Sequence, residues 1–388
     1  MRKGWCSATS SCFLIKKENS ILTQERLSSL DVFRGLTIAG MILVNNPGSW
    51  EYVYAPLQHA KWHGWTPTDL IFPFFLFIVG VSISLSFSRR LEQSRGKPSL
   101  YSKIFKRSLI LFTLGLLLAL IPRFNFTTLR IPGVLQRIAI CYLLASLLFL
   151  KTGTKGRSII ALAFLAIYWI VMKLVPVPGY GPGILEYEGN LCSYLDSQLL
   201  AGHLYKPGFD PEGILSTLPA ISTALLGTLT GDWLRSFQSV LQKTGGLFIG
   251  GIVLTMSGLL LHPLFPINKQ LWTSTFVLFA AGAALLLLGA CYWLIEGLKL
   301  RKWAFPFLVF GTNAIAVYVG SALMVKLMGL IRISSNGSVL SFKTLVFTRL
   351  LAPWAGNYFG SLVYPLLLII IWLGIMIPLY RNKIFIKI

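Results

Sequence analysis

Ten apolar stretches recur along this 388-residue chain, and they constrain its fold more than any other feature. A helix needs about 20 mostly apolar residues to cross the hydrocarbon core of a bilayer. The sequence therefore predicts an all-α, polytopic integral membrane protein with about ten transmembrane helices. We expect them over residues 33–49, 69–88, 106–122, 131–150, 158–176, 212–234, 245–262, 272–296, 304–328 and 361–380.

The low charge content of the chain favours the same class. Only 12% of its residues are charged and 55% are hydrophobic, whereas soluble globular chains carry about 25% charged residues. This composition excludes an ordinary cytosolic enzyme, a disordered protein and a nucleic-acid-binding domain. The net charge of +22 agrees with a membrane protein, because Lys and Arg collect in its cytoplasmic loops.

The positions of Lys and Arg predict the orientation of the spans. With a cytoplasmic N-terminus, most basic residues fall in inside segments, above all in a cluster over residues 89–107. We therefore expect both termini to be cytoplasmic, with residues 1–30 as a cytoplasmic segment and residues 31–388 as one transmembrane domain. The first 30 residues contain no adequate apolar core for a cleavable signal peptide.

Two segments outside the ten spans have features of their own. Residues 338–353 are apolar but interrupted by Lys343, Arg349 and Pro353, which predicts a re-entrant or interfacial segment. The external loop, about residues 177–211, begins with a Pro-Gly-Tyr-Gly-Pro-Gly run that turns tightly. Because a loop of this length is more often functional than idle, we expect a lid or a wall of a substrate site.

The first two predicted spans and the loop between them hold the densest set of ionisable groups, which are costly at membrane depth. His59 lies on the outside face, before Asp69 at the start of the second span. An imidazole can take a proton from an amine or attack an acyl group, and Asp69 could orient it. The structural alternatives are an aromatic-belt histidine and a helix-start acid that offsets the macrodipole. His63 competes with His59 on equal terms.

Three more polar residues lie in the first predicted span or directly before it. Asn45 is expected to be a buried amide, able to donate to a carbonyl or oxyanion or, equally, to bond between helices. Asp31 and Arg34 are three residues apart, so they can pair locally at the cytoplasmic end of the helix.

A second polar group surrounds the fourth and sixth spans. Arg137 lies inside the fourth span and must find an anion or carbonyls there. A phosphate of a cofactor is one candidate partner, and a structural partner such as Asp31 or Asp69 is the other. The acids Asp210 and Glu212 precede the sixth span. They could bind a cationic amino group or cap the helix.

Several other site classes are absent from the sequence. It contains no Walker loop, no dinucleotide glycine fingerprint and no metal-binding spacing of Cys and His, so we expect no metal. A disulfide framework is not expected from the five cysteines, which are Cys6, Cys12, Cys141, Cys192 and Cys291.

An ordered series of motifs resembles the heparan-α-glucosaminide N-acetyltransferase family over about residues 26–388. The resemblance rests on the segments Leu27–Gly35, Met41–Asn45, His59–Gly64, Asp69–Pro73, Arg130–Arg137, Asp210–Leu215, Asn268–Trp272, Asn313–Ile315 and Tyr380–Phe385.

The resemblance implies a membrane-embedded enzyme that moves acetyl from cytosolic acetyl-CoA to the amino group of a glucosamine-type sugar on the other side. By motif, the active histidine is His59 rather than His63, and the active-site asparagine is Asn45. Asp69 becomes the supporting carboxylate. The candidates for CoA binding or structural pairing are Arg34, Arg130 and Arg137.

Compared with the lysosomal enzyme, the chain lacks an extra lumenal domain and a leading span. It therefore resembles a prokaryotic member in a cytoplasmic membrane, acting on an amino sugar or cell-wall fragment. Acetyl-histidine and direct transfer both stay open, as does a homodimer. Two other functions compete: a transporter of a sugar or lipid intermediate, and an O-acyltransferase of cell-envelope polysaccharide.

Overall fold

The computed structural model describes residues 27–92, 97–121, 124–335 and 338–386. The predicted N-terminal segment lies almost entirely outside the described residues, and so do Cys6 and Cys12. The three cysteines within the described part, at 141, 192 and 291, are free and buried.

Helices form nearly all of the regular structure. The long helices are α2 (Ser28–Asn45), α3 (Pro67–Glu92), α4 (Lys97–Leu120), α5 (Val134–Lys151), α6 (Thr154–Leu174), α8 (Thr217–Arg235), α9 (Val240–Leu260), α10 (Ser274–Tyr292), α12 (Ala314–Leu330) and α15 (Asn357–Arg381). The shorter ones are α7 (Leu191–Leu199), α11 (Phe305–Thr312), α13 (Phe342–Leu345) and α14 (Ala352–Ala355), with 3₁₀ turns at Ala55–Leu57 and Lys302–Ala304 and π turns at Trp293–Gly297 and Val346–Leu351.

Among the described residues, six helices are long and apolar enough to cross a membrane, or up to seven if the bent pair α11–α12 is one span. The six are α3, α5, α6, α9, α10 with its continuation to Gly297, and α15. Each of the ten predicted spans overlaps a helix, but their number as membrane spans stays a prediction.

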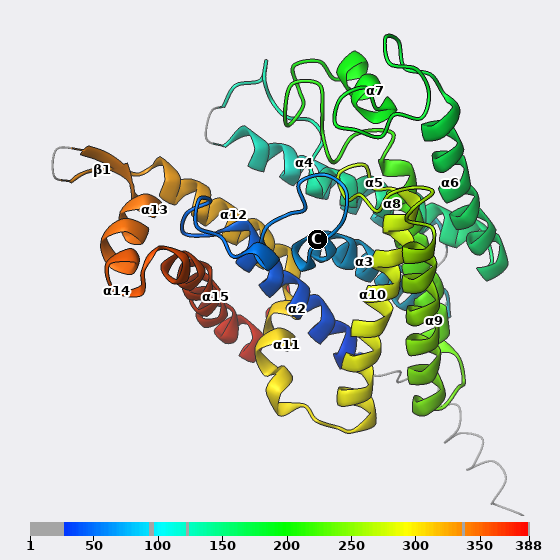
Figure 1. The fold of residues 1–388 in the computed structure, drawn as a ribbon. Helices are drawn as coiled ribbons and strands as arrows, with labels where there is room; N and C mark the ends of the chain where they lie inside the picture. The colour runs from blue at the N-terminus through cyan, green and yellow to red at the C-terminus, as the bar shows by residue number, and fades with distance from the viewer. Residues whose placement is uncertain (1–26, 93–96, 122–123, 336–337, 387–388) are drawn as a thin grey trace, which may run out of the picture.

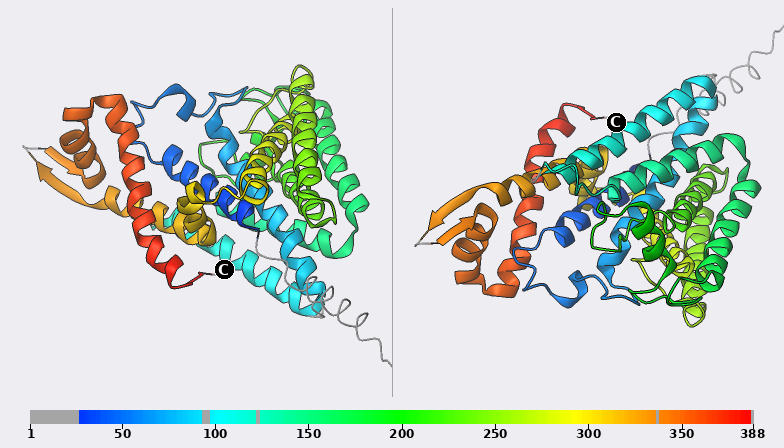
Figure 2. Two further views of the ribbon diagram at one scale, coloured as in Figure 1. Left: turned by 90° about the horizontal axis from the view of Figure 1, so that it is seen from below. Right: turned by 90° about the horizontal axis from the view of Figure 1, so that it is seen from above.

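Figures 1 and 2 show the arrangement of the helices. Helices α6, α8, α9 and α10 lie together on one side of the molecule, and α12 to α15 lie on the other. Helices α2 and α3 run between these two groups, and α7 lies at the end of the bundle near α6 and α8.

Glycines allow the central helices to approach one another closely. A Cβ on Gly80 of α3 would lie 1.9 Å from the carbonyl oxygen of Ala224 on α8. A Cβ on Gly35 of α2 would lie 1.8 Å from the carbonyl oxygen of Phe307 on α11. Small residues serve this purpose in membrane bundles, where backbone packing replaces the hydrophobic effect. These close approaches hold α3 against α8 and α2 against α11.

The predicted all-α class holds for nearly all of the described residues, with one short exception. Strands β1 (Arg332–Ser335) and β2 (Ser338–Ser341) form an antiparallel hairpin, and α13 and α14 follow it. The physical reason is visible in the sequence, because an Asn-Gly pair between two short runs is a strong hairpin signal. The segment predicted to be re-entrant or interfacial is therefore a series of short elements.

One predicted span is not a continuous helix. The stretch 304–328 is divided into α11 and α12, which meet at an angle of 75°. Near the far end of α12, Lys326 Nζ donates to the carbonyl oxygens of Leu118 and Ile121, at 2.7 Å each. The lysine thus satisfies carbonyls at the end of α4 that have no partner within the helix.

The loop predicted to be external is built around α7. Its glycine-rich start turns back on itself at the Val177–Gly181 bridge, with positive φ angles at Gly179, Gly181 and Gly183, as predicted. Asn190 caps α7 by accepting a hydrogen bond from the Ser193 backbone nitrogen at 2.8 Å. Side chains of this loop pack against Tyr168 of α6 in a buried apolar cluster, so the loop forms a fixed cover over this end of the bundle.

Candidate active site

His59 and Asp69 form a hydrogen-bonded pair at the start of α3. His59 Nδ1 lies 2.7 Å from Asp69 Oδ1. The side chain of Asp69 is 2% exposed and that of His59 is 42% exposed. Since a carboxylate only accepts hydrogen bonds, Nδ1 carries the hydrogen, which leaves the Nε2 lone pair free in the neutral ring. The arrangement gives an exposed base held by a buried acid.

The second carboxylate oxygen of Asp69 holds the loop that carries His59. It accepts hydrogen bonds from the backbone nitrogens of Ala60 and Thr66, both at 3.0 Å, and from the Thr66 hydroxyl at 3.1 Å. The Thr66 hydroxyl also lies 2.7 Å from the Gln58 carbonyl oxygen. Asp69 therefore fixes both its histidine and the loop on either side of it.

Lys269 is the third ionisable group of this cluster. In the sequence it stood out only as part of the motif Asn268–Trp272. Its Nζ lies 3.1 Å from His59 Nδ1 and 3.5 Å from Asp69 Oδ1. It comes from the loop before α10, which is joined to the His59 loop by the Gly64 nitrogen donating to the Ile267 carbonyl at 2.8 Å. Burial lowers the pKa of Lys269, although the charges of Asp69 and Glu212 oppose this change.

These residues line a cavity of about 350 Å³, here called the His59 cavity. The structure brings four of the predicted site residues together in its wall: His59, Asp69, Asn45 and Arg130. Helices α2, α3, α5 and α12 contribute, and the other lining residues include Val134, Tyr205, Lys206, Glu212, Lys269, Gln270 and Tyr318.

The expectation that Asn45 is buried was wrong. Asn45 is the last residue of α2 and is exposed in the wall of the cavity. The helix ends here because Pro47 disfavours helical geometry in the residue before it. The buried amide is that of Asn46, which donates to the Ile42 carbonyl at 2.9 Å.

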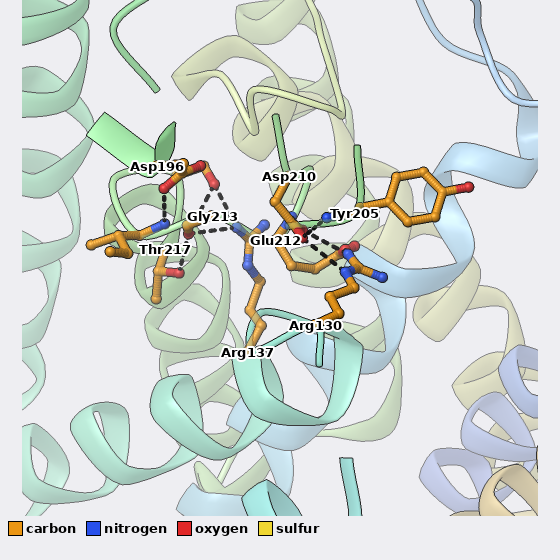
Figure 3. Close-up of polar contacts among 10 residues, drawn as sticks. Arg130, Arg137, Asp196, Tyr205, Asp210, Glu212, Gly213 and Thr217 are labelled. Carbon is orange, nitrogen blue, oxygen red and sulfur yellow. Dashed lines mark hydrogen bonds and ion pairs between the residues drawn. The ribbon is translucent and has the colours of Figure 1, made fainter. Parts of the chain in front are cut away.

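Arg130 is bound by two carboxylates at the edge of the His59 cavity (Figure 3). Its guanidinium donates to both oxygens of Asp210, at 2.8 and 2.6 Å, and to Glu212. It also lies 4.8 Å from the ring centre of Tyr205. Burial disfavours the charged guanidinium, but Asp210 and Glu212 outweigh burial and raise its pKa. One cation between two anions leaves the group with a net negative charge.

Arg137 lies away from that cavity, in a neighbouring buried network (Figure 3). Its Nη2 donates to the Gly213 carbonyl at 3.1 Å and to the Ser216 hydroxyl at 2.5 Å, and its guanidinium lies 5.1 Å from the ring of Trp272. Neither of the carboxylates proposed from sequence is its hydrogen-bond partner in the described structure. Its part in CoA binding stays a prediction.

Arg34 belongs to a second cavity of about 280 Å³, here called the Arg34 cavity. Arg34 pairs with Asp31 at 2.8 Å, which confirms the predicted local ion pair. It also donates to Ser82 Oγ at 2.8 Å and to the Gly311 carbonyl at 3.2 Å. The cavity is lined as well by Arg90 and Arg107, so it is basic.

The two cavities follow one another along the same helices. On α3, Phe72 lines the His59 cavity and Phe75, one turn later, lines the Arg34 cavity. On α5, Val134 lines the His59 cavity and the next residue, Leu135, lines the Arg34 cavity. The two cavities therefore lie next to each other against α3 and α5.

His63 does not take part in this arrangement. It lies 3.5 Å from Glu186 and 3.3 Å from Asn268, and it is not in the wall of the His59 cavity. Within the described ranges, no three His, Cys, Asp or Glu residues are grouped in a way that could hold a metal ion.

The fold and the site define a class: a helical membrane-type protein with a His–Asp pair in one cavity and a basic cavity beside it. The family model described as heparan-alpha-glucosaminide N-acetyltransferase, catalytic, matches residues 26–249. The chain belongs to this family, as its motifs indicated.

Two relatives extend the comparison. The chain is 31% identical to the heparan-alpha-glucosaminide N-acetyltransferase of Homo sapiens over 351 residues, covering 76% of this chain and 52% of the human protein. It is 30% identical to that of Mus musculus over 351 residues, covering 76% and 53%. The chain thus spans about half the length of the curated relatives it matches.

Proposed function

We propose that this protein is a transmembrane N-acetyltransferase, which moves an acetyl group from cytosolic acetyl-CoA to the amino group of a glucosamine-type sugar on the outer side of the membrane. Family membership supports the reaction class. The observation that carries the proposal is the exposed imidazole of His59, held at Nδ1 by the buried Asp69 within a cavity.

His59 has two chemically complete routes. In direct transfer, Nε2 removes a proton from the acceptor amine as the amine attacks the thioester carbonyl, and the thiolate of CoA leaves. In the covalent route, Nε2 itself attacks the thioester carbonyl and the thiolate of CoA leaves. The amine then attacks the acetyl carbon, the bond from that carbon to Nε2 breaks, and the freed Nε2 takes the proton of the amine. In both routes Asp69 stabilises the ring while it carries positive charge. Asn45 donates a hydrogen bond to the acetyl oxygen as negative charge develops there.

The Arg34 cavity is suited to the anionic end of acetyl-CoA. Arg34, Arg90 and Arg107 give it positive charge, and guanidinium groups bind phosphate through paired hydrogen bonds. Ser82, which contacts Arg34, lies 13 residues after Asp69 on α3, or about 20 Å along the helix axis. We propose that the pantetheine arm spans this interval and brings the thioester to His59. The predicted CoA contacts of Arg130 and Arg137 are weaker candidates, because Arg130 lies in the wall of the His59 cavity between two carboxylates and Arg137 lines neither cavity.

The Arg130–Asp210–Glu212 group is suited to the acceptor. Glu212 lines the His59 cavity, where its carboxylate can accept a hydrogen bond from the amino group of the acceptor, and Tyr205 offers an aromatic face for a sugar ring.

The proposed orientation has both termini in the cytoplasm, about ten spans in residues 31–388, and the loop of residues 177–211 outside, with the protein in a cytoplasmic membrane. The end of α3 that carries Asp69 then faces outward, and the end that carries Arg90 faces the cytosol. A homodimer is compatible with this orientation.

The test is acetyl transfer by purified protein in detergent, using radiolabelled acetyl-CoA and glucosamine, with His59→Ala and His63→Ala as a matched pair. We expect transfer by the wild type and by His63→Ala, and none above background by His59→Ala. Equal activity of the two variants would remove His59 from the mechanism. Absence of acetyl-CoA binding by the wild type would favour a transporter.

A further inference from the structure

The break between α11 and α12 places a buried amide beside the Arg34 cavity. Asn313 is the residue between the two helices, which meet at 75°. It is 2% exposed. Its neighbours on both sides, Gly311, Thr312, Ala314 and Ile315, line the Arg34 cavity. A polar side chain buried at this depth requires partners for both its oxygen and its nitrogen.

Those partners come from the segment that follows α15. Asn313 Nδ2 donates to the Ile384 carbonyl oxygen at 3.2 Å, and the Ile386 backbone nitrogen donates to Asn313 Oδ1 at 2.8 Å. One side-chain amide therefore binds the backbone on both sides of a single residue, in the way a neighbouring strand would. The contact joins positions 71 and 73 residues apart in sequence.

This attachment positions a side chain at the Arg34 cavity. Ile386 lines that cavity, together with Arg34 and Arg107 from the opposite helices. The segment Ile384–Ile386 is therefore one wall of a cavity that is otherwise formed by α2, α3, α4, α5 and the helix break. Arg34 in turn donates to the Gly311 carbonyl at the same break. The helix break therefore holds both the Arg34 guanidinium and the segment Ile384–Ile386.

We propose that the segment Ile384–Ile386, held by Asn313, forms part of the binding site for acetyl-CoA, and that Asn313 is a positioning residue for donor binding. The inference rests on the proposed function, and it gives a role to two of the motifs, Asn313–Ile315 and Tyr380–Phe385, that the chemistry of His59 does not use. The apolar Ile386 side chain contacts the uncharged part of the donor, while the arginines bind its phosphates. Loss of the two hydrogen bonds between Asn313 and this segment weakens donor binding and leaves the chemical step at His59 unchanged.

The first test compares Asn313→Ala with Asn382→Ala, an exposed asparagine just after α15. Asn313→Ala removes two hydrogen bonds and releases the segment that forms one wall of the Arg34 cavity. We therefore expect the KM for acetyl-CoA to rise about tenfold, with kcat within twofold of the wild type. Asn382→Ala is expected to match the wild type. Because Asn313→Ala could also disturb the helix break, deletion of the residues after Lys383 provides a second variant, with the same expected increase. An unchanged KM in both variants would overturn the inference.

The second test does not depend on turnover. Ile386→Cys is introduced into a chain whose Cys6 and Cys12 are replaced by Ser, and its modification by a maleimide is timed with and without CoA. We expect CoA to slow the modification at least fivefold. Unprotected modification by a protein that binds CoA would refute the inference alone. Absence of CoA binding by the wild type would refute the proposed function, and the inference with it.

Discussion

Replacing Asp69 by Asn is the sharpest test of the His59–Asp69 pair, because the structure determines which way the new amide must face. Asp69 Oδ2 accepts three hydrogen bonds, from Ala60 and Thr66, whereas Oδ1 accepts one, from His59. An amide nitrogen cannot accept. Placing it at Oδ2 would leave the backbone N–H groups of Ala60 and Thr66 without an acceptor, and each unsatisfied buried donor costs about 1–3 kcal/mol. The amide nitrogen therefore takes the position next to His59.

That orientation inverts the tautomer of the imidazole. His59 Nδ1 must then accept a hydrogen bond from the amide, so the ring hydrogen moves to Nε2 and the exposed lone pair is lost. General-base catalysis is worth about 10²–10⁴ in rate, and inversion of a catalytic histidine by this kind of change can cost about 10⁴. We expect Asp69→Asn to lower kcat about 10³-fold while the protein stays folded, because three of the four hydrogen bonds persist.

The assay is acetyl transfer at saturating acetyl-CoA and glucosamine, with the thermal unfolding temperature measured in parallel. The matched control is Asp196→Asn, a buried carboxylate on the same side of the bundle whose Oδ1 accepts one hydrogen bond, from the Ile214 nitrogen at 2.9 Å. It should retain activity within threefold. In a His59→Ala background, Asp69→Asn should cause no further loss, because the two residues act as one unit. A kcat for Asp69→Asn within threefold of the wild type would refute the reasoning.

Three further predictions follow from single side chains. Lys269→Met should lower kcat about 10–100-fold and Lys269→Arg less, because the cation next to His59 and Asp69 is removed in the first and kept in the second; equal kcat values for both would contradict this. Burial raises the pKa of Asp196 from 3.8 to about 6, so its contribution to stability is present below about pH 4 and is lost as the pH rises through 6. The loss is about 3 kcal/mol, and Asp196→Asn should unfold at a higher temperature than the wild type above pH 6 but not at pH 4. Gly80→Ala should lower the unfolding temperature by forcing α3 from α8, whereas Gly374→Ala, whose Cβ would meet no atom within 4 Å, should not.

The places where the sequence analysis succeeded and failed have a common physical pattern. Helix positions were predicted because apolar length and backbone hydrogen bonding within a helix are local properties. The Asp31–Arg34 pair was predicted for the same reason, since the two residues are one turn apart. The break at Asn313 was missed because a run of apolar residues gives no signal when an amide within it is satisfied by a segment 71 residues away.

The sequence by itself determined the class of the protein, its helices, its family and the pairing candidates His59 and Asp69. These depend on composition, periodicity and motifs, which need no knowledge of distant contacts. Only the tertiary structure decided that Lys269 lies beside His59, that Asp210 and Glu212 bind Arg130, and that Asn45 is exposed in a cavity. Such contacts join loops that are far apart in the chain, and the burial and charge of each group depend on all of its neighbours at once.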